Sequence, residues 1–163
     1  MTLTTIFATQ DWALGVSDMR RTNLKTGQQI DDTPKVLKVN DLLGQGFIQE
    51  LLKEQTPEEV DLTLHFCGRD NSGKMTLYDT SIHEGYKIMR TDISPEGIRW
   101  RCSFAEYDPA PWLGKQFRGV KTFELPWVKR IAKKLVKHVA DNDTYVSRER
   151  KIEILEDRQA EKG

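Results

Sequence analysis

The chain has 163 residues, of which 37% are hydrophobic and 31% are charged. This composition is typical of one well-solvated globular domain and excludes an intrinsically disordered chain. The 25 basic and 25 acidic residues give a net charge of zero, which excludes a polycation. No segment approaches the length of a transmembrane helix, so we expect no membrane insertion.

The first residues carry neither the basic region nor the long apolar run of a secretory signal. Cys67 and Cys102 are the only cysteines and lie far apart in the sequence. Without an export signal, we expect both as reduced thiols in a cytoplasmic protein.

The first half of the chain predicts several strands and one helix. β-branched and aromatic residues favour strands, and strict alternation of apolar and polar residues indicates a half-buried strand. These signals predict strands over residues 2–8, 36–39, 60–67 and 75–80. An Asn- and Gly-containing turn over residues 23–27 predicts a hairpin, and Asn40 is a suitable N-cap for a helix over residues 40–55.

In the second half, residues 81–91 fit a helix and a strand equally well, so their state stays open. Residues 98–104 alternate as a strand. The Pro-rich residues 108–114 predict a rigid loop carrying Trp112, and residues 117–125 predict a last strand.

The clearest pattern lies in residues 126–140, PWVKRIAKKLVKHVA, where apolar residues recur at steps of three and four. This period predicts an amphipathic helix with one buried stripe. Its polar positions are cationic: Lys129, Arg130, Lys133, Lys134 and Lys137. Residues 115–138 contain eight Lys or Arg and one acid, a charge of +7, so the rest of the chain carries −7.

Together these elements predict an α+β fold. We expect an antiparallel sheet, as a meander or a partly open barrel, covered by the C-terminal amphipathic helix. Residues 1–146 form a single domain in this interpretation. Residues 147–163 follow as a charged helical tail, because few apolar residues are available to hold them against the domain.

Residues 68–74 match GxxxxGK, the first part of a phosphate-binding P-loop. That site needs a Ser or Thr after the Lys and a helix whose N-terminus points at the phosphates. Met75 follows the Lys instead, and the next residues read as a strand. We therefore predict a hairpin loop joining two antiparallel strands.

Residues 92–97, DISPEG, resemble the DxSxxG half of the signature of PilZ domains. The resemblance implies binding of cyclic di-GMP, with a basic RxxxR segment upstream. The nearest match to that segment is Arg21 with Lys25, and residues 94–97 are also an ordinary turn sequence.

The sequence gives little support for a metal site or for a catalytic group. His65 and Cys67 share a strand face, but a zinc site would need His83 and Cys102 to converge on them. No spacing places a base beside a thiol, and His138 suits a helix C-terminus. We therefore expect no metal, no cofactor and a non-enzymatic protein, and an enzyme stays open as the third function class because no complete catalytic constellation is present.

The basic surface is the main functional candidate. Arg99 and Arg101 lie on the solvent face of their predicted strand, and Trp112 lies in the same region. The further cations are Lys115, Arg118, Lys121, Lys129, Arg130, Lys133, Lys134 and Lys137. We expect a non-enzymatic interaction or assembly protein, a subunit or adaptor of a bacterial or phage complex, that docks a protein partner or another copy through this face. Nucleic-acid binding through the same face and Trp112, or a PilZ-like role, are the alternatives.

Overall fold

The computed structural model describes residues 3–23, 25–32, 35, 63–81, 85 and 87–156. In this part of the chain, nine strands and two helices follow one another. They are β1 (Thr4–Ala8), β2 (Trp12–Asp18), β3 (Arg21–Thr22), β4 (Gln29–Ile30), β5 (Thr63–Arg69), β6 (Met75–Ser81), β7 (Met89–Asp92), β8 (Arg99–Ser103), α2 (Ala110–Phe117), α3 (Leu125–Ala140) and β9 (Arg150–Glu156).

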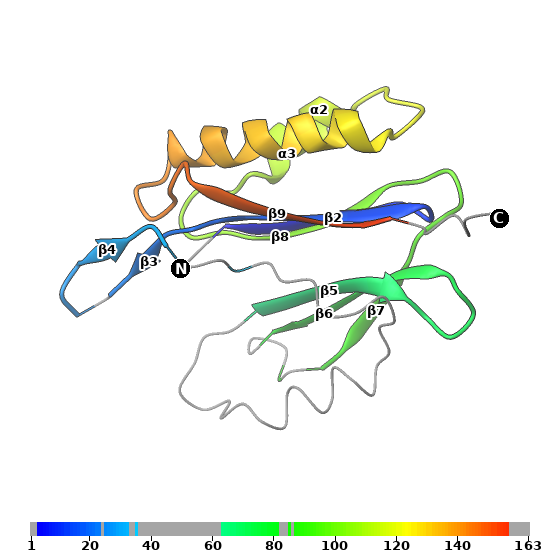
Figure 1. Cartoon of the computed structure of the whole chain (residues 1–163), viewed down its shortest axis with the longest axis horizontal. Coiled ribbons are helices and arrows are strands. Elements are labelled where there is room, and N and C mark those ends of the chain that lie inside the picture. The colour runs from blue at the N-terminus through cyan, green and yellow to red at the C-terminus, as the bar shows by residue number, and fades with distance from the viewer. Residues whose placement is uncertain are drawn as a thin grey trace, which may run out of the picture.

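The elements stack in layers (Figure 1). A four-stranded antiparallel sheet has the order β8-β1-β2-β9, and α2 and α3 lie on one side of it. A three-stranded antiparallel sheet, β5-β6-β7, lies on the other side, while β3 and β4 form a small separate hairpin. The predicted α+β class with antiparallel sheets is confirmed, but the strands divide between sheets instead of forming one meander or barrel.

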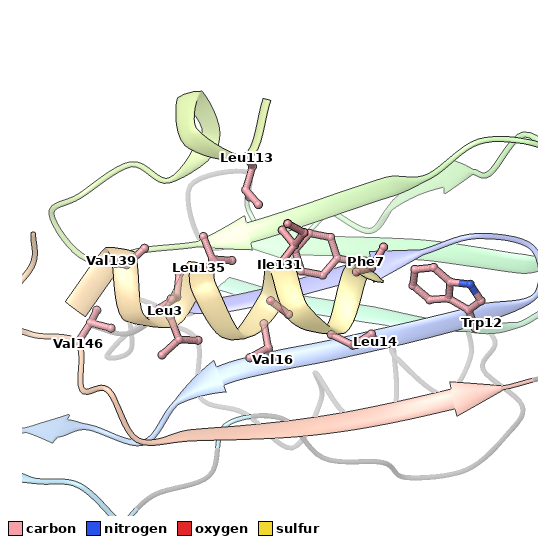
Figure 2. Close-up of a cluster of buried hydrophobic side chains, with 13 residues drawn as sticks. Leu3, Phe7, Trp12, Leu14, Val16, Leu113, Ile131, Leu135, Val139 and Val146 are labelled. Atoms are coloured by element: carbon pink, nitrogen blue, oxygen red, sulfur yellow. The ribbon is translucent and has the colours of Figure 1, made fainter. Parts of the chain in front are cut away.

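The larger core lies between α3 and the four-stranded sheet. The apolar stripe of α3 is buried at Val128, Ile131, Ala132, Leu135, Val136 and Val139. Figure 2 shows Phe7, Leu14 and Val16 of the sheet beside Ile131 and Leu135 of the helix. Fully burying a side chain of this size contributes about 1.5–3 kcal/mol, so this contact holds the helix in place.

A second apolar cluster joins the two sheets. Ile6, Ala8 and Ala13 of the first sheet are buried together with Met75 and Leu77 of β6. Alternation along each strand places these residues opposite the α3-facing side chains. The two central strands of this sheet, β1 and β2, are therefore buried on both faces.

The prediction of a rigid loop over residues 108–114 is wrong, because Ala110–Phe117 forms α2. Pro109 is its N-cap and Pro111 lies in the first turn, where a missing N–H costs no helical hydrogen bond. Asp108 accepts a hydrogen bond from the Ala110 N–H at 2.9 Å, and Leu113 anchors the helix in the core.

The predicted strand over residues 117–125 is also wrong. Phe117 ends α2, and Gly119 adopts a left-handed backbone with φ of 76°, which breaks any extended run. The connection then leads directly into α3 at Leu125. Phe117, Phe123 and Leu125 nevertheless pack against the larger core, as their apolar character indicated.

The helical prediction for the tail is wrong over residues 150–156, which form β9. This strand pairs with β2 along its whole length, from Arg150 opposite Asp18 to Glu156 opposite Trp12. Ile152 and Ile154 alternate with polar residues and pack on the core, so their spacing is that of a strand. A sheet edge supplies the burial that the segment lacks alone.

Several other predictions can be placed. Gly27, with φ of 72°, closes the predicted turn by donating to the Asn23 carbonyl at 2.7 Å, and β3 and β4 flank it. The undecided segment contains β7 at its end. The strand predicted over residues 36–39 and the helix predicted over residues 40–55 lie outside the described residues. Of the strand predicted over residues 60–67, the structure describes residues 63–67, which belong to β5. Within the described helices, none is long and apolar enough to cross a membrane.

Candidate functional site

A buried carboxylate at the end of β2 organises the most unusual polar site of the described chain. The Asp18 side chain has no exposed surface. Its Oδ1 accepts hydrogen bonds from the Leu3 N–H at 3.0 Å and from Lys35 Nζ at 2.7 Å. Its Oδ2 accepts from the Arg20 N–H at 2.9 Å and the Ser147 N–H at 3.3 Å. A buried ion requires such a full set of partners, because an unpaired charge there costs several kcal/mol.

Lys35 supplies the opposite charge. Its side chain is 16% exposed, and Nζ also donates to the Arg20 carbonyl oxygen. Burial lowers the pKa of Lys35 below its ordinary value, and the hydrogen bond to Asp18 opposes that effect only in part. A lysine with a pKa depressed by burial and a carboxylate beside it is typical of functional sites.

Segments from both ends of the chain assemble this site. Leu3 immediately precedes β1, and Ser147 lies between α3 and β9. Ser147 Oγ accepts from the Met19 N–H at 3.2 Å and donates to the Glu149 carbonyl at 3.1 Å. Thr2, which is joined covalently to Leu3, lies outside the described residues.

A second ion pair borders the site. Arg20 Nε and Nη2 donate to the two oxygens of Asp31 at 2.8 and 2.9 Å, and Nη1 donates to the Thr144 carbonyl at 2.8 Å. This pairing raises the pKa of Arg20 and lowers that of Asp31, in each case mainly through the side-chain hydrogen bond. The loop carrying Asp31 is thereby fixed to the segment before β9.

The arrangement places a proton donor, Lys35, beside a carboxylate that fixes its position. A lysine held by a carboxylate can stabilise or move a proton at a neighbouring hydroxyl group. Within the described residues, no group of three or more His, Cys, Asp or Glu side chains is placed to hold a metal ion.

The expected basic face is only partly continuous. On α3, Arg130, Lys133, Lys134 and Lys137 are exposed and Lys129 is half-buried. Lys115, Arg118 and Lys121, in and after α2, are exposed as well.

Arg101 does not join this face. Its Nε donates to Asp79 of β6 at 2.6 Å, so its side chain lies between the two sheets. Arg99 shares that side of β8 by strand alternation. The four-stranded sheet therefore separates both arginines from the cations of α3, and the prediction of one patch that includes them is wrong.

Trp112 lies on α2 and not on a loop. Its ring is half-buried and stacks on His138, with centroids 5.1 Å apart and planes at 19°. His138 Nε2 lies 2.9 Å from the Tyr107 hydroxyl. One face of the Trp112 ring is thus already occupied by α3.

The two sequence motifs, GxxxxGK at residues 68–74 and DISPEG at residues 92–97, form turns. Residues 68–74 join β5 to β6 as the predicted hairpin, and Asp70 accepts the N–H groups of Ser72 and Lys74 at 2.8 and 3.1 Å. In the DISPEG segment, the Gly97 N–H donates to the Ser94 carbonyl at 3.0 Å. A Cβ at Gly97 would lie 2.2 Å from Ser94 Oγ, the end of a side chain that can rotate away, so this contact alone does not require a glycine.

The side chains of His65 and Cys67 have different surroundings. His65 bonds to Asp79 and Ser103, whereas Cys67 packs against the apolar cluster between the sheets. Burial raises the pKa of both Cys67 and Cys102 to about 12, which favours the inert thiol form.

Sequence reasoning missed Asp18, Lys35 and Ser147. Asp18 and Lys35 are 17 positions apart, and Ser147 lies 129 positions from Asp18, so no local spacing connects them. The available signal was a carboxylate at the end of the mostly apolar run of β2.

Comparison with known proteins identifies no family for this chain. No protein-family model matches the chain. No curated protein matches it either. One similar solved structure is eukaryotic HslV from Trypanosoma brucei, with 15% sequence identity, a TM-score of 0.48, and coverage of 94% of this chain and 99% of that one. A likeness at this level carries no argument about this chain.

Proposed function

We propose that the chain is an amide-bond hydrolase whose nucleophile is the hydroxyl of Thr2, once the peptide bond before Thr2 has been cut. One observation carries the proposal. The buried Asp18 carboxylate binds both Lys35 and the amide N–H of Leu3, the residue to which Thr2 is joined. An N-terminal threonine has its own base, because its free α-amine lies on the carbon next to the one that bears the hydroxyl.

The reaction has two balanced steps. The Thr2 hydroxyl gives its proton to the α-amine while its oxygen bonds to the substrate carbonyl carbon. The carbon–nitrogen bond of the substrate then breaks as the leaving amine takes that proton. Water attacks the remaining ester, which releases the carboxylic acid and restores the hydroxyl.

Lys35 and Asp18 have supporting roles in this mechanism. In this mechanism the Lys35 ammonium favours negative charge on the nucleophile, and Asp18 fixes the position of Lys35. Because burial lowers its pKa, Lys35 gives up its proton more readily than an exposed lysine does.

The chemical state of Thr2 is the first test. Intact mass should show that the purified protein begins at Thr2. Periodate should then cleave its 1,2-amino alcohol and leave an aldehyde that a hydrazide captures. A Thr2 amide that stays blocked and resists periodate overturns the proposal.

Activity is the second test. Peptide mixtures incubated with the protein should show new termini by mass spectrometry. Thr2→Ala and Lys35→Ala should each lower the rate by roughly a thousand-fold, whereas Thr2→Ser should retain a measurable rate. Thr122→Ala and Lys134→Ala change exposed residues of the same types and are the matched controls. Full activity of Thr2→Ala would refute the assignment.

A second function, docking through the basic side of the helical layer, is favoured by a separate observation. The exposed cations of α2, α3 and their connection form no ion pair with any described residue. We propose an acidic protein surface, on another protein or a second copy of this chain, as the partner, with the apolar stripe of α3 reserved for covering the sheet.

Charge reversal tests this second function. Lys133→Glu with Lys137→Glu should abolish an association seen by light scattering or pull-down, and rising salt should weaken that association in the unmodified chain. Nucleic acid is the competing partner. A steep log–log salt dependence with an oligonucleotide would support nucleic acid over protein. A thermal shift with cyclic di-GMP would instead support the PilZ-like alternative.

A further inference from the structure

A second polar network lies between the two sheets and has no part in the site described above. It joins three strands: His65 of β5, Asp79 of β6 and Ser103 of β8. Ser103 Oγ lies 2.7 Å from His65 Nε2, and His65 Nδ1 lies 2.8 Å from Asp79 Oδ1. A hydroxyl, an imidazole and a carboxylate are thus connected in order through the two different ring nitrogens.

This order is the one that activates a serine. The imidazole takes the proton of the hydroxyl at one nitrogen, and the carboxylate holds the imidazole in the correct orientation at the other. The side chains of His65 and Asp79 are only 6% and 8% exposed, so their positions are fixed by packing. Arg101 Nε also donates to Asp79 Oδ2 at 2.6 Å, and its Nη2 donates to Thr91 at 2.8 Å, which immobilises the carboxylate further.

Ser103 is less buried as a residue than the side chains of His65 and Asp79. It is half-buried at the end of β8, which is an edge strand of its sheet among the described strands. A surface hollow of about 360 Å³ follows the same strand and is lined by residues 98–102. In an antiparallel edge strand, alternate N–H groups point away from the sheet, and such groups can receive the negative oxygen of an acyl intermediate.

We propose that Ser103 is the nucleophile of a separate esterase site, with His65 as its base and Asp79 as a positioning residue. Arg99 lines the hollow, is exposed and forms no ion pair with a described residue, so it suits a substrate that carries a carboxylate or phosphate. The substrate class is therefore a small ester with an anionic group.

Ser103 gives its proton to His65 Nε2 as Oγ bonds to the ester carbonyl carbon. The imidazolium returns that proton to the leaving alcohol, and an acyl-serine remains. Water then gives a proton to His65 and its oxygen to the acyl carbon, the acid leaves, and Ser103 regains its proton.

A fluorophosphonate probe tests the nucleophile. The unmodified chain should gain one covalent adduct, and peptide mapping should place it on Ser103, a measurement that needs no variant. Ser103→Ala and His65→Gln should lower labelling by roughly a thousand-fold, whereas Ser72→Ala, at an exposed serine of the β5–β6 loop, should not. Absence of an adduct, or an adduct on another residue, overturns the proposal.

Two further measurements separate catalysis from a purely structural network. The monosuccinate ester of p-nitrophenol should be hydrolysed faster than the neutral butyrate ester, and Arg99→Gln should remove that preference while sparing the neutral substrate. Asp79→Asn should change the pH profile of labelling as well as its rate. Equal hydrolysis of both esters contradicts the substrate class, and an unchanged pH profile contradicts the role of Asp79. Thr2→Ala leaves this site intact, so the two proposed activities can fail independently.

Discussion

Replacement of Asp18 by Asn tests the central feature of the candidate site, a fully buried carboxylate paired with Lys35. Asn keeps the size of the side chain and one acceptor oxygen. It removes the negative charge and presents an NH₂ group where the carboxylate accepted hydrogen bonds. Of the four described donors that converge on Asp18, two therefore lose their acceptor.

The size of the effect follows from this geometry. Breaking one partner of a buried ion pair typically costs about 3–5 kcal/mol, because the other charge stays buried and unpaired. Each orphaned backbone N–H adds about 1–3 kcal/mol where no water replaces the acceptor. Since Lys35 is 16% exposed and can reach water in part, we expect the lower range, a loss of about 3–4 kcal/mol in the free energy of unfolding.

Urea unfolding, followed by far-ultraviolet circular dichroism, measures this loss. A double-mutant cycle with Lys35→Met isolates the pair, and the double variant should be more stable than Asp18→Asn alone, because no charge is then left unpaired. Lys134→Met, on the exposed face of α3, is the matched control and should change stability by less than about 0.5 kcal/mol. A loss below about 1 kcal/mol for Asp18→Asn, or strict additivity in the cycle, would refute the reasoning.

Burial lowers the folded-state pKa of Lys35 below its ordinary value of 10.5. The contribution of Lys35 to the free energy of unfolding is therefore most favourable above pH 10.5, and that advantage is lost as the pH falls through the lowered pKa. The difference in stability between wild type and Lys35→Met, measured over an alkaline pH series, checks this prediction. Hydrogen bonds, first that from Ser72, lower the pKa of Asp70 to about 2, so its stabilising contribution is lost as pH falls from 3.8 towards 2, and Asp70→Asn should flatten acid unfolding in that window. Leu135→Ala should cost about 2–5 kcal/mol in urea unfolding, and a cost below 1 kcal/mol would mean that α3 does not pack as described.

Some elements could be predicted because their signal is complete within the element. The 16 residues of α3 repeat an apolar stripe over four turns, and no other part of the chain is needed to recognise it. The hairpin at residues 68–74 is similar, since alternation on both sides and a glycine with φ of 78° define it locally.

Other elements depend on partners that a linear pattern does not contain. β9 has too few apolar residues to be stable alone, yet β2 provides a full ladder and a core for Ile152 and Ile154. α2 was obscured by Pro111, because a proline in the first turn of a helix and a proline in a loop look alike in sequence.

The polar sites were the least predictable, because register brings their residues together. His65 and Ser103 are 38 positions apart and meet only because β5 lies across β8 in the stacked sheets. The lowered pKa of Lys35 likewise arises from burial, which no count of neighbouring residues in the sequence measures.

Both sites lie where β1 begins, and the topology explains why. Thr4 pairs with Ser17 on one side and with Ser103 on the other, so β2 and β8 both end at the start of β1. The strand pairing ends at this edge of the sheet. A residue outside the strands, such as Lys35, can therefore place its side chain there. Asp18 and Ser103 point to opposite faces of the sheet, since Asp18 shares the face of Leu14 and Val16 whereas Ser103 contacts the second sheet. One sheet edge thus supports two separate polar networks, and the apolar clusters on both faces offset the cost of burying them.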